Sequence, residues 1–418
     1  MAKKKVGRKL EKPTAIASIV SGFPMIKNVG LRQVYVADTL ICNIDGTHGK
    51  LIYRGYSIET LAEYSTFEET SFLLLYGNLP TRTELAAFTS ALKAERALPV
   101  DVLKSLMRMP RGTPPMDVLQ AVTSTLAGHD PEITGTNREA SVRKAIRLLA
   151  KMATVVAAWS RAREGEEPIP PRDDLSHAAN FLFMLTGREP DPEHARAFDV
   201  NLILQAEHQF NASTFTCRVV ASTRAHMYAC VAAGIGALSG PLHGGASNEV
   251  IKMLREIGTA DRAAQYVKAK LASGDRVMGM GHAVYKTHDP RALILRDMAI
   301  QLAGQPGGDR RWFDLSQAVE KSAAEEFRKR GKTGIYPNVD FFTAVVNTAL
   351  GIPPDLHTPV FTMSRIAGWC AHIIEEKFAE AQPKPAIYRP QAHYVGPGST
   401  MKSLPYVAIA KRRKGKES

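Results

Sequence analysis

Long apolar runs are absent from this sequence of 418 residues. The longest, such as residues 152–159 and 230–238, fall well short of the roughly 18 residues that cross a bilayer. This excludes an integral membrane protein, and we expect no membrane partner. The first residues also lack the apolar stretch of a secretory signal, and their lysines do not form an amphipathic transit peptide. We therefore expect a cytoplasmic location.

Cysteine is scarce, and the motifs that would use it to bind a metal are missing. The four cysteines, Cys42, Cys217, Cys230 and Cys370, are far apart, with no CxxC pair to hold zinc or form a redox site. The disulfide-dense pattern of a small secreted protein is also absent, so we expect a reducing compartment. The sequence has no HExxH or comparable ligand spacing, which argues against a metal-dependent hydrolase and predicts no metal site.

Positive charge is in excess, but most of it lies at the two ends of the chain. The formal net charge is +13, of which residues 1–12 carry +5 and residues 410–418 carry +4. The long body between them is therefore close to neutral. Two solvated basic tails can adhere weakly to polyanions, but they do not form a basic globular face. We expect no specific nucleic-acid partner.

The sequence predicts a mainly α fold with a small β-hairpin near the N-terminus. Residues 34–44 favour an extended chain, Asp45-Gly46 supplies a turn, and a second short strand follows at 51–53. Further on, Thr81-Arg-Thr-Glu84 forms a capping box, because its hydroxyl and carboxylate satisfy free amides in the first turn of a helix. Helical patterns then cover residues 137–163, 174–186, 191–210, 213–236, 247–257, 260–272, 289–303, 311–330, 340–350 and 360–378.

No repeat at a fixed period and no long low-complexity linker divides the chain. The boundary signals are a glycine-rich turn at 240–245 and Pro337-Asn338, which bracket a run of helices. We predict that this run is a smaller, movable domain. The predicted organisation is a basic N-terminal tail and lead-in at 1–30, a large helical domain at 31–243 plus 346–405, a small helical domain at 244–345 and a basic C-terminal tail at 406–418.

The first segment with chemical potential is Gly240-Pro-Leu-His243-Gly-Gly-Ala246, which precedes a helix that Ser247 is expected to cap. A histidine at the approach to a helix N-terminus lies at the positive end of the helix dipole, which disfavours the imidazolium form. His243 is therefore expected to be neutral and to donate a hydrogen bond. The neighbouring glycines allow a ligand to approach the backbone closely.

The second segment, residues 277–291, brings Gly281-His282, Lys286 and Arg291 close together in sequence. Its Gly-x-Gly lacks the spacing and the preceding strand of a dinucleotide site. A flexible backbone followed by His, Lys and Arg is typical of a turn that recognises an anion. Asp289-Pro290 begins the next helix, so Arg291 is expected in its first turn, where the guanidinium can meet a carboxylate bidentately.

The third group lies towards the C-terminus and comprises Asp340, which follows Tyr336-Pro-Asn-Val at the start of a helix, together with Arg365 and Arg389. Each candidate also has a purely structural interpretation. Asp340 could serve only as an N-cap, Arg365 only as a salt-bridge partner, and a histidine beside glycines only as a turn residue. Taken together, the three groups indicate an enzyme that acts on a small polyanion.

The order and the amino-acid sequences of these segments resemble those of the citrate synthase family over nearly the whole chain except its tails. Several motifs of more than one residue, in the right order and spacing, make the resemblance specific. The matching segments are 49–56, 67–69, 74–80, 115–118, 206–214, 240–246, 281–291, 337–340, 364–368 and 389–390. This resemblance implies a two-domain, mainly α fold of the citrate synthase type.

The family joins an acyl-CoA to oxaloacetate, and the resemblance implies three catalytic residues. Asp340 would take a proton from the carbon next to the thioester carbonyl, and His243 would donate a hydrogen bond to the enol oxygen that forms. His282 would polarise or protonate the ketone oxygen of oxaloacetate, after which the CoA thioester is hydrolysed. A non-catalytic relative that binds CoA or nucleic acid would be expected to lack one of the three, and all are present.

The resemblance also implies the residues that bind the substrates. Oxaloacetate would contact His208, Arg291 and Arg365, with Arg389 contributed by the neighbouring subunit of a homodimer. No cofactor would be bound permanently, since acetyl-CoA or propionyl-CoA is a co-substrate. The positions that match the CoA-binding residues of the family are Val277, Gly279, Met280 and Gly281 for the adenine and Lys286 for a phosphate.

Two departures from the family pattern leave these assignments unchanged. Ser247 stands where Asn is frequent, and both residues cap helices. Ala283 stands where many bacterial members have Arg. The resemblance favours citrate synthase, which uses acetyl-CoA, and leaves 2-methylcitrate synthase as the alternative, because one methylene of propionyl-CoA is worth only about 1–3 kcal/mol in a pocket. No role is assigned to the other histidines at 288, 357, 372 and 393.

Overall fold

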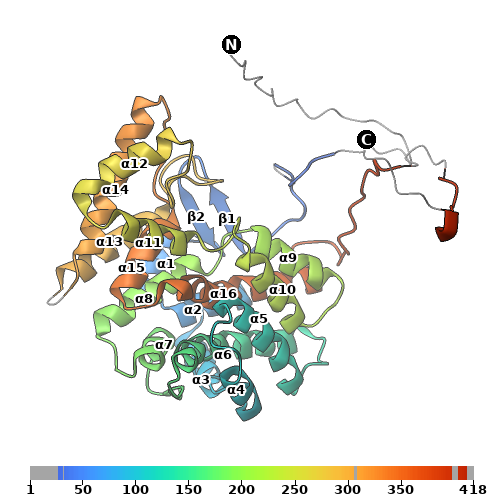
Figure 1. Ribbon diagram of the computed structural model, residues 1–418. Helices are drawn as coiled ribbons and strands as arrows, with labels where there is room; N and C mark the ends of the chain where they lie inside the picture. Colours follow the sequence, from blue (N-terminus) through green and yellow to red (C-terminus); the bar gives the residue numbers. More distant parts are fainter. Residues whose placement is uncertain (1–26, 32, 306–307, 398–402, 412–418) are drawn as a thin grey trace. The chain divides into compact units, whose positions relative to one another are not determined.

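The computed structural model describes residues 27–31, 33–305, 308–397 and 403–411 (Figure 1). These residues form two units, of which the first ends at Pro385 and the second begins at Ala386. The basic segment at 1–12 and nearly all of the one at 410–418 lie outside the described residues. Among the described residues, no helix is both long enough and apolar enough to span a bilayer.

The small N-terminal sheet has three antiparallel strands, β1 (Cys42–Asp45), β2 (Lys50–Tyr53) and β3 (Tyr56–Ser57), in the order β1-β2-β3. The predicted hairpin is confirmed, with Cys42 opposite Tyr53 and Asp45 opposite Lys50. The extended stretch predicted at 34–44 is wrong for residues 34–41, which are not a strand. The N–H of Leu40 donates to the Glu375 carboxylate (2.7 Å), a side-chain partner where a strand would use a neighbouring backbone.

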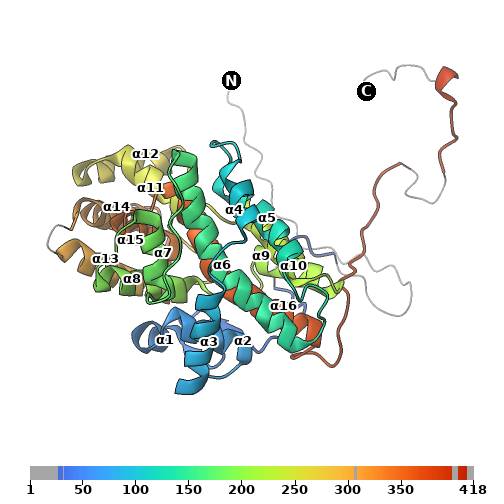
Figure 2. The same ribbon diagram turned by 90° about the horizontal axis from the view of Figure 1, so that it is seen from below.

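The fold is mainly α, as predicted. The helices before and after the central insert are α1 (Ile58–Tyr64), α2 (Phe67–Tyr76), α3 (Arg82–Ala94), α4 (Val100–Met107), α5 (Pro115–Leu126), α6 (Arg138–Glu164), α7 (His177–Thr186), α8 (Pro192–Gln205), α9 (Ala212–Ser222), α10 (Met227–Ser239) and α16 (His357–Phe378). Short 3₁₀ turns lie at Ala127–His129, Ala260–Arg262, Pro354–Leu356 and Ile409–Lys411. The two longest helices, α6 and α16, pack together and are buried over most of their length (Figure 2). Such all-round burial is typical of central core helices.

The helices of the central insert gather in one part of the first unit (yellow to orange in Figure 1). They are α11 (Ala246–Ile257), α12 (Ala263–Ala272), α13 (Pro290–Gly304), α14 (Arg311–Lys329) and α15 (Val339–Ala349). Helix α12 packs against α14, and both α11 and α13 pack against α15. This group corresponds closely to residues 244–345, whose independence as a movable small domain stays a prediction.

Two predicted helices have different limits in the structure. The helix predicted at 213–236 is two helices, because Arg224 adopts a left-handed conformation (φ 70°) and the His226 side chain caps α10 by accepting from the Ala229 N–H (3.2 Å). The helix predicted at 191–210 ends at Gln205, which leaves His208 on a loop. The predicted capping box is present, with the Thr81 hydroxyl and the Glu84 carboxylate bonded to each other's backbone amides.

A buried ionic network joins α9 to α16. Arg218 donates to Glu375 and lies 2.7 Å from Glu376, while His372 contacts Arg218 at 3.1 Å and Glu207 at 3.0 Å. All five side chains are buried, and a buried charge is tolerated only where it is paired in this way. His372, to which the sequence assigned no role, is therefore part of the core.

Candidate active site

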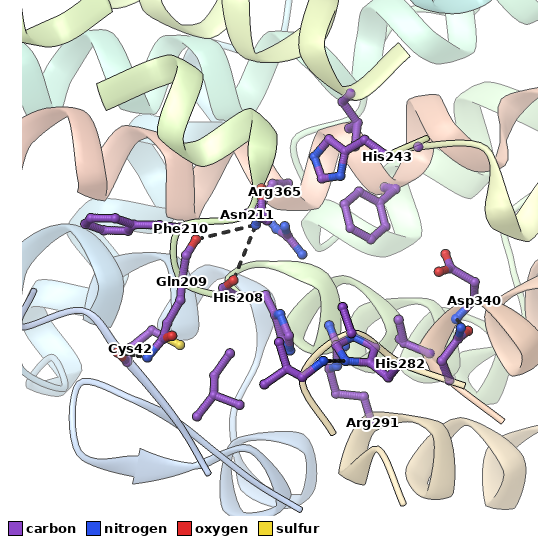
Figure 3. Close-up of a pocket in the computed structure, with 18 of the residues that line it drawn as sticks. Cys42, His208, Gln209, Phe210, Asn211, His243, His282, Arg291, Asp340 and Arg365 are labelled. Atoms are coloured by element: carbon purple, nitrogen blue, oxygen red, sulfur yellow. Dashed lines mark hydrogen bonds between the residues drawn. The ribbon is translucent and has the colours of Figure 1, made fainter. Parts of the chain in front are cut away.

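A cavity of about 980 Å³ lies between the central helices and the rest of the first unit (Figure 3). Its lining combines loop residues 34–39 and 208–211 and residues 42–44 of β1 with residues of the two glycine-rich turns and of α15 and α16. Six residues singled out from the sequence line it together: His208, His243, His282, Arg291, Asp340 and Arg365. Segments that are distant in sequence thus converge on one space.

His243 lies on the tight turn between α10 and α11. Its backbone N–H and that of Gly244 both donate to the carbonyl of Gly240 (3.0 and 3.1 Å). A Cβ on Gly244 would come within 2.0 Å of the Leu238 carbonyl oxygen, so only glycine fits there. The predicted cap at Ser247 is wrong, because α11 begins at Ala246 and its N-cap is Gly245, a left-handed glycine two residues before Ser247. The Ser247 hydroxyl instead contacts His357 Nδ1 (3.1 Å).

The protonation of His243 follows from its neighbours. Its Nε2 accepts the backbone N–H of Ser213 (3.1 Å) and lies 2.8 Å from the Ser213 hydroxyl. A backbone N–H can only donate, so Nε2 is unprotonated and the neutral ring carries its proton on Nδ1. Burial, helped by the Arg365 charge, lowers the pKa of His243 to about 4. Burial and a nearby cation therefore both favour the neutral donor that the sequence led us to expect.

Backbone hydrogen bonds also fix the ring of His282, which lies on the second glycine-rich turn. Its Nδ1 accepts the backbone N–H groups of Val284 (3.0 Å) and Tyr285 (3.2 Å), which leaves Nε2–H as the donor of the neutral ring (Figure 3). Burial and Arg291 lower the pKa of His282 to about 4. The turn itself is tied to the start of α15, since the N–H of Gly281 donates to the carbonyl of Tyr336 (2.7 Å).

Asp340 is the second residue of α15, and its carboxylate does not cap the helix. Asn338 does so by accepting the Asp340 N–H (3.0 Å), while its amide donates to the Gly281 carbonyl (2.9 Å). The interpretation of Asp340 as an N-cap is therefore wrong, and its carboxylate points into the cavity (Figure 3). Burial raises the pKa of Asp340 to about 6, although the charge of Arg291 favours ionisation.

Two buried arginines supply positive charge. Arg291 lies in the first turn of α13, as predicted, and Asp289 holds it bidentately through Nε (3.0 Å) and Nη2 (2.8 Å). Arg365 donates from Nε to the carbonyl of Gln205 (2.7 Å), and its guanidinium lies 4.5 Å from the centre of the Phe361 ring. Within the described residues no carboxylate pairs with Arg365, so the interpretation as a salt-bridge partner is wrong.

His208 lies on the loop after α8 and is buried. Its Nε2 lies 3.2 Å from the Tyr285 hydroxyl, and its ring centre is 5.4 Å from that of His282. Burial holds the pKa of His208 well below its ordinary value, with a further contribution from Arg291. The neutral imidazoles of His208, His243 and His282 and the buried guanidiniums of Arg291 and Arg365 therefore line the same cavity. Such a set is able to bind carboxylates and to donate hydrogen bonds to uncharged oxygens. His357 and Arg276, to which the sequence assigned no role in the site, line the cavity as well.

The remaining predicted site residues are distributed differently. Gly281 alone of the expected adenine contacts lines the cavity; Val277 and Gly279 are buried, and a Cβ on Gly279 would come within 2.8 Å of Phe341. Met280 is partly buried and forms a bridge with Pro337. Lys286 is exposed and outside the cavity lining, and its N–H donates to the Gly46 carbonyl (2.8 Å). Arg389 is an exposed residue of the second unit.

No group of three or more His, Cys, Asp or Glu side chains suited to a metal ion occurs within the part of the chain that the structure describes. All four cysteines are buried and carry free thiols. The cavity therefore offers a ligand imidazoles, guanidiniums, the carboxylates of Asp38 and Asp340, and hydroxyl and amide groups.

The family model described as "Citrate synthase, C-terminal domain" matches residues 30–391, which is most of the chain. The chain belongs to the citrate synthase family. The predicted resemblance is thereby confirmed. A citrate synthase from Deinococcus radiodurans is 44% identical over 88% of this chain and 95% of the relative, and a 2-methylcitrate synthase from Shewanella oneidensis is 37% identical over 89% and 95%.

Solved structures of the family share the fold. Citrate synthase from Pyrobaculum aerophilum superposes with a TM-score of 0.85 at 38% identity, covering 98% of this chain and all of that one. Citrate synthase from Thermoplasma acidophilum, solved with carboxymethyl coenzyme A and oxaloacetate, gives a TM-score of 0.84 at 32% identity, covering 92% and 98%. The prediction of a citrate synthase-like fold is confirmed.

Three residues that the sequence did not single out for a role in the site support this citrate synthase-type cavity. The backbone N–H of Ser213 determines the tautomer of His243. Asn338 caps α15, so the carboxylate of Asp340 is not used for capping. The hydroxyl of Tyr285 contacts His208. The role of Asn338 could have been predicted from the sequence, because Asn is a preferred N-cap residue and it lies just before the predicted helix. Ser213 and Tyr285 had none, since their partners are distant in sequence.

Proposed function

We propose that this chain condenses acetyl-CoA with oxaloacetate and hydrolyses the resulting citryl-CoA to citrate and CoA. The observation that carries the proposal is the meeting, in one cavity, of a carboxylate with a raised pKa and two imidazoles held neutral as donors. Enolising a thioester needs a base on one side and a donor to the forming oxyanion on the other. The family to which the chain belongs supports the same acyl-CoA:oxaloacetate reaction.

Oxaloacetate carries two carboxylates and a ketone, and the cavity offers partners for all three. Arg291 and Arg365 would bind the carboxylates, with His208 as a further donor, because fixed guanidiniums hold carboxylates with defined geometry. The Nε2–H of His282 would then point at the ketone oxygen. The Thermoplasma acidophilum relative, solved with oxaloacetate and a CoA derivative, supports this substrate pair.

Enolisation would use Asp340 and His243 together. The carboxylate takes a proton from the methyl carbon of the thioester, while Nδ1–H of His243 donates to the carbonyl oxygen as negative charge develops there. A neutral donor suits this step, since it keeps its proton and needs no reorganisation. Burial supports the same chemistry, because a carboxylate with a pKa of about 6 is a stronger base than an exposed one and is still ionised at pH 7.

Condensation and hydrolysis would follow in the same cavity. The enolate carbon attacks the ketone carbon of oxaloacetate, and His282 gives its Nε2 proton to the alkoxide oxygen, which becomes the hydroxyl of citryl-CoA. Asp340 then releases the proton that it removed, and His282 takes one up, so that both groups are restored. Water then adds to the thioester carbonyl, the carbon–sulfur bond breaks, and CoA leaves as the thiol. Hydrolysis makes the overall reaction effectively irreversible, and no permanently bound cofactor takes part.

The remaining contacts are proposed on the family pattern. The turn at 277–281 would receive the CoA adenine and Lys286 a phosphate, and the central helices would close over the bound substrates as a small domain. Closure would exclude water and protect the enol. We also propose a cytoplasmic location, which the four free, buried thiols support because reducing compartments keep cysteines unpaired.

We propose that Arg389 completes the site of a second copy in a homodimer. Support comes from the second unit taken by itself, whose Tyr394, Val395, Tyr406 and Ile409 are each more than half exposed. Apolar side chains along such a segment gain stability by covering another surface.

Mixing two inactive variants tests this composite site. Random pairing of Asp340→Asn with Arg389→Ala subunits should restore about a quarter of wild-type activity, because half the dimers then hold one intact site. The readout is thiol release after unfolding and refolding the mixture. Activity that stays at the level of the two separate variants would contradict a shared site.

The acyl substrate is tested by initial rates of CoA thiol release with oxaloacetate and either acetyl-CoA or propionyl-CoA. We expect kcat/KM to favour acetyl-CoA by about 10- to 200-fold, the discrimination that one methylene allows. The higher identity to the Deinococcus citrate synthase than to the 2-methylcitrate synthase supports this choice. A preference for propionyl-CoA would assign 2-methylcitrate synthase activity, and no release with either thioester would contradict the proposed reaction.

A further inference from the structure

Tyr285 lies among three of the groups proposed to bind oxaloacetate: it contacts His208 and His282 directly, and its ring lies near the guanidinium of Arg291. The residue is on the loop between α12 and α13, and only 2% of its surface is exposed. Its hydroxyl lies 3.2 Å from His208 Nε2, and its backbone N–H donates to His282 Nδ1 (3.2 Å). The guanidinium carbon of Arg291 lies 6.0 Å from the centre of its ring.

The hydroxyl contact joins distant parts of the chain. His208 belongs to the predicted large domain and Tyr285 to the predicted small domain, so the contact crosses the boundary between them. A buried hydroxyl needs a hydrogen-bond partner, and His208 provides it. Because the imidazole is also buried, each group restricts the rotamers of the other.

The ring contact restrains the second histidine. The ring centres of Tyr285 and His282 are 4.8 Å apart with an interplanar angle of 44°. The backbone hydrogen bond fixes which nitrogen of His282 carries the proton, and the ring limits the tilt of the imidazole. One residue therefore constrains both the orientation and the tautomer of the group proposed to face the ketone.

The loop that carries Tyr285 is braced by the β-hairpin. A Cβ on Gly46 would come within 2.3 Å of the Val284 carbonyl oxygen, and one on Gly49 within 2.7 Å of the His288 carbonyl oxygen. The Gly46 carbonyl also accepts the Lys286 N–H (2.8 Å). Backbone packed this closely on both sides of Tyr285 limits its movement.

We propose that Tyr285 is a positioning residue that sets the relative orientation of His208 and His282 for oxaloacetate. The inference rests on the proposed function and deepens it, because it assigns the alignment of the oxaloacetate half of the cavity to a side chain that does not react. Tyr285 acts through the two histidines, whereas acetyl-CoA meets His243 and Asp340 on the other side.

The hydroxyl is tested with Tyr285→Phe, which keeps the ring. We expect the Kd of oxaloacetate, measured by calorimetry, to rise about fivefold, the value of one neutral hydrogen bond. The KM for acetyl-CoA at saturating oxaloacetate should stay within about twofold of wild type. Tyr266→Phe, which removes a hydroxyl bonded to Glu256 (2.7 Å) far from the cavity, is the matched control and should change neither value. An unchanged oxaloacetate Kd in Tyr285→Phe would overturn the inference.

A double-mutant cycle separates positioning from general structural damage. In a His208→Gln background, removing the Tyr285 hydroxyl should alter the oxaloacetate Kd by less than about twofold, because the partner is already gone. A full additive loss in that background would overturn the inference. Turnover by the wild type tests the proposed reaction separately, and the oxaloacetate titrations need no acyl-CoA, so either idea can fail alone.

Discussion

Replacing Asp340 with Asn should lower kcat by about 10²- to 10⁴-fold, the range that a positioned general base contributes. The amide keeps the size and shape of the side chain but cannot accept the proton of the thioester methyl group. Because Asn338 caps α15 through the backbone of residue 340, the change leaves the helix start intact. The KM for oxaloacetate should change little, since the two arginines and His208 remain.

The matched control is Asp297→Asn on α13, whose carboxylate is 67% exposed. This variant should retain wild-type kcat, because it removes one surface charge outside the cavity. Thiol release is measured for both proteins at saturating substrates. A kcat for Asp340→Asn within tenfold of wild type would show that another group removes the proton.

The same carboxylate should set the acidic limb of the pH profile. Burial raises the pKa of Asp340 to about 6, so the base is lost by protonation as the pH falls through this value. His243 and His282, each with a pKa of about 4, stay neutral over that range and keep their donor protons. The kcat/KM should therefore fall tenfold per unit below about pH 6. An acidic limb near 4 would contradict the raised pKa of Asp340, because a carboxyl of ordinary pKa would titrate there together with the two imidazoles.

Replacing His243 with Ala should lower kcat by about 10²- to 10³-fold, the usual cost of removing one donor to a developing oxyanion. Nδ1–H is the group lost, and the methyl group of Ala cannot donate a hydrogen bond in its place. Since the donor acts on the enol oxygen, the KM for oxaloacetate should change much less than kcat. Steady-state rates for both substrates give the two parameters.

Ser213→Ala is the informative companion to this variant. The backbone N–H of residue 213 still donates to His243 Nε2, so the tautomer should persist and kcat should fall less than about tenfold. Equal losses in the two variants would show that the hydroxyl, and not the amide, controls the histidine. Circular dichroism of both proteins checks that the overall helical content is unchanged.

The mainly α class and the residues proposed for catalysis could both be predicted from the amino-acid sequence alone. Capping at Thr81 and the helical period of α6 depend on residues within one or two turns of each other, so both can be predicted from a short stretch of sequence. His243, His282 and Asp340 each lie in a short motif where a helix meets a loop. Each motif is a continuous stretch of sequence, so its resemblance to the family could be recognised without the structure. The start of α13 at Pro290 was likewise readable from Asp289-Pro290.

The orientation and the charge of these side chains depend on long-range contacts that the amino-acid sequence does not display. Ser213 is 30 residues from His243, and Tyr285 is 77 residues from His208, so neither pairing can be read from spacing. The extended pattern at 34–41 does not form a strand, and Leu40 in this segment is held by a long-range hydrogen bond to Glu375. The helical pattern across 223–226 is interrupted because Arg224 adopts a left-handed backbone conformation. The pKa values of the two histidines and of Asp340 have the same origin, because removal from water depends on which distant segments close the cavity.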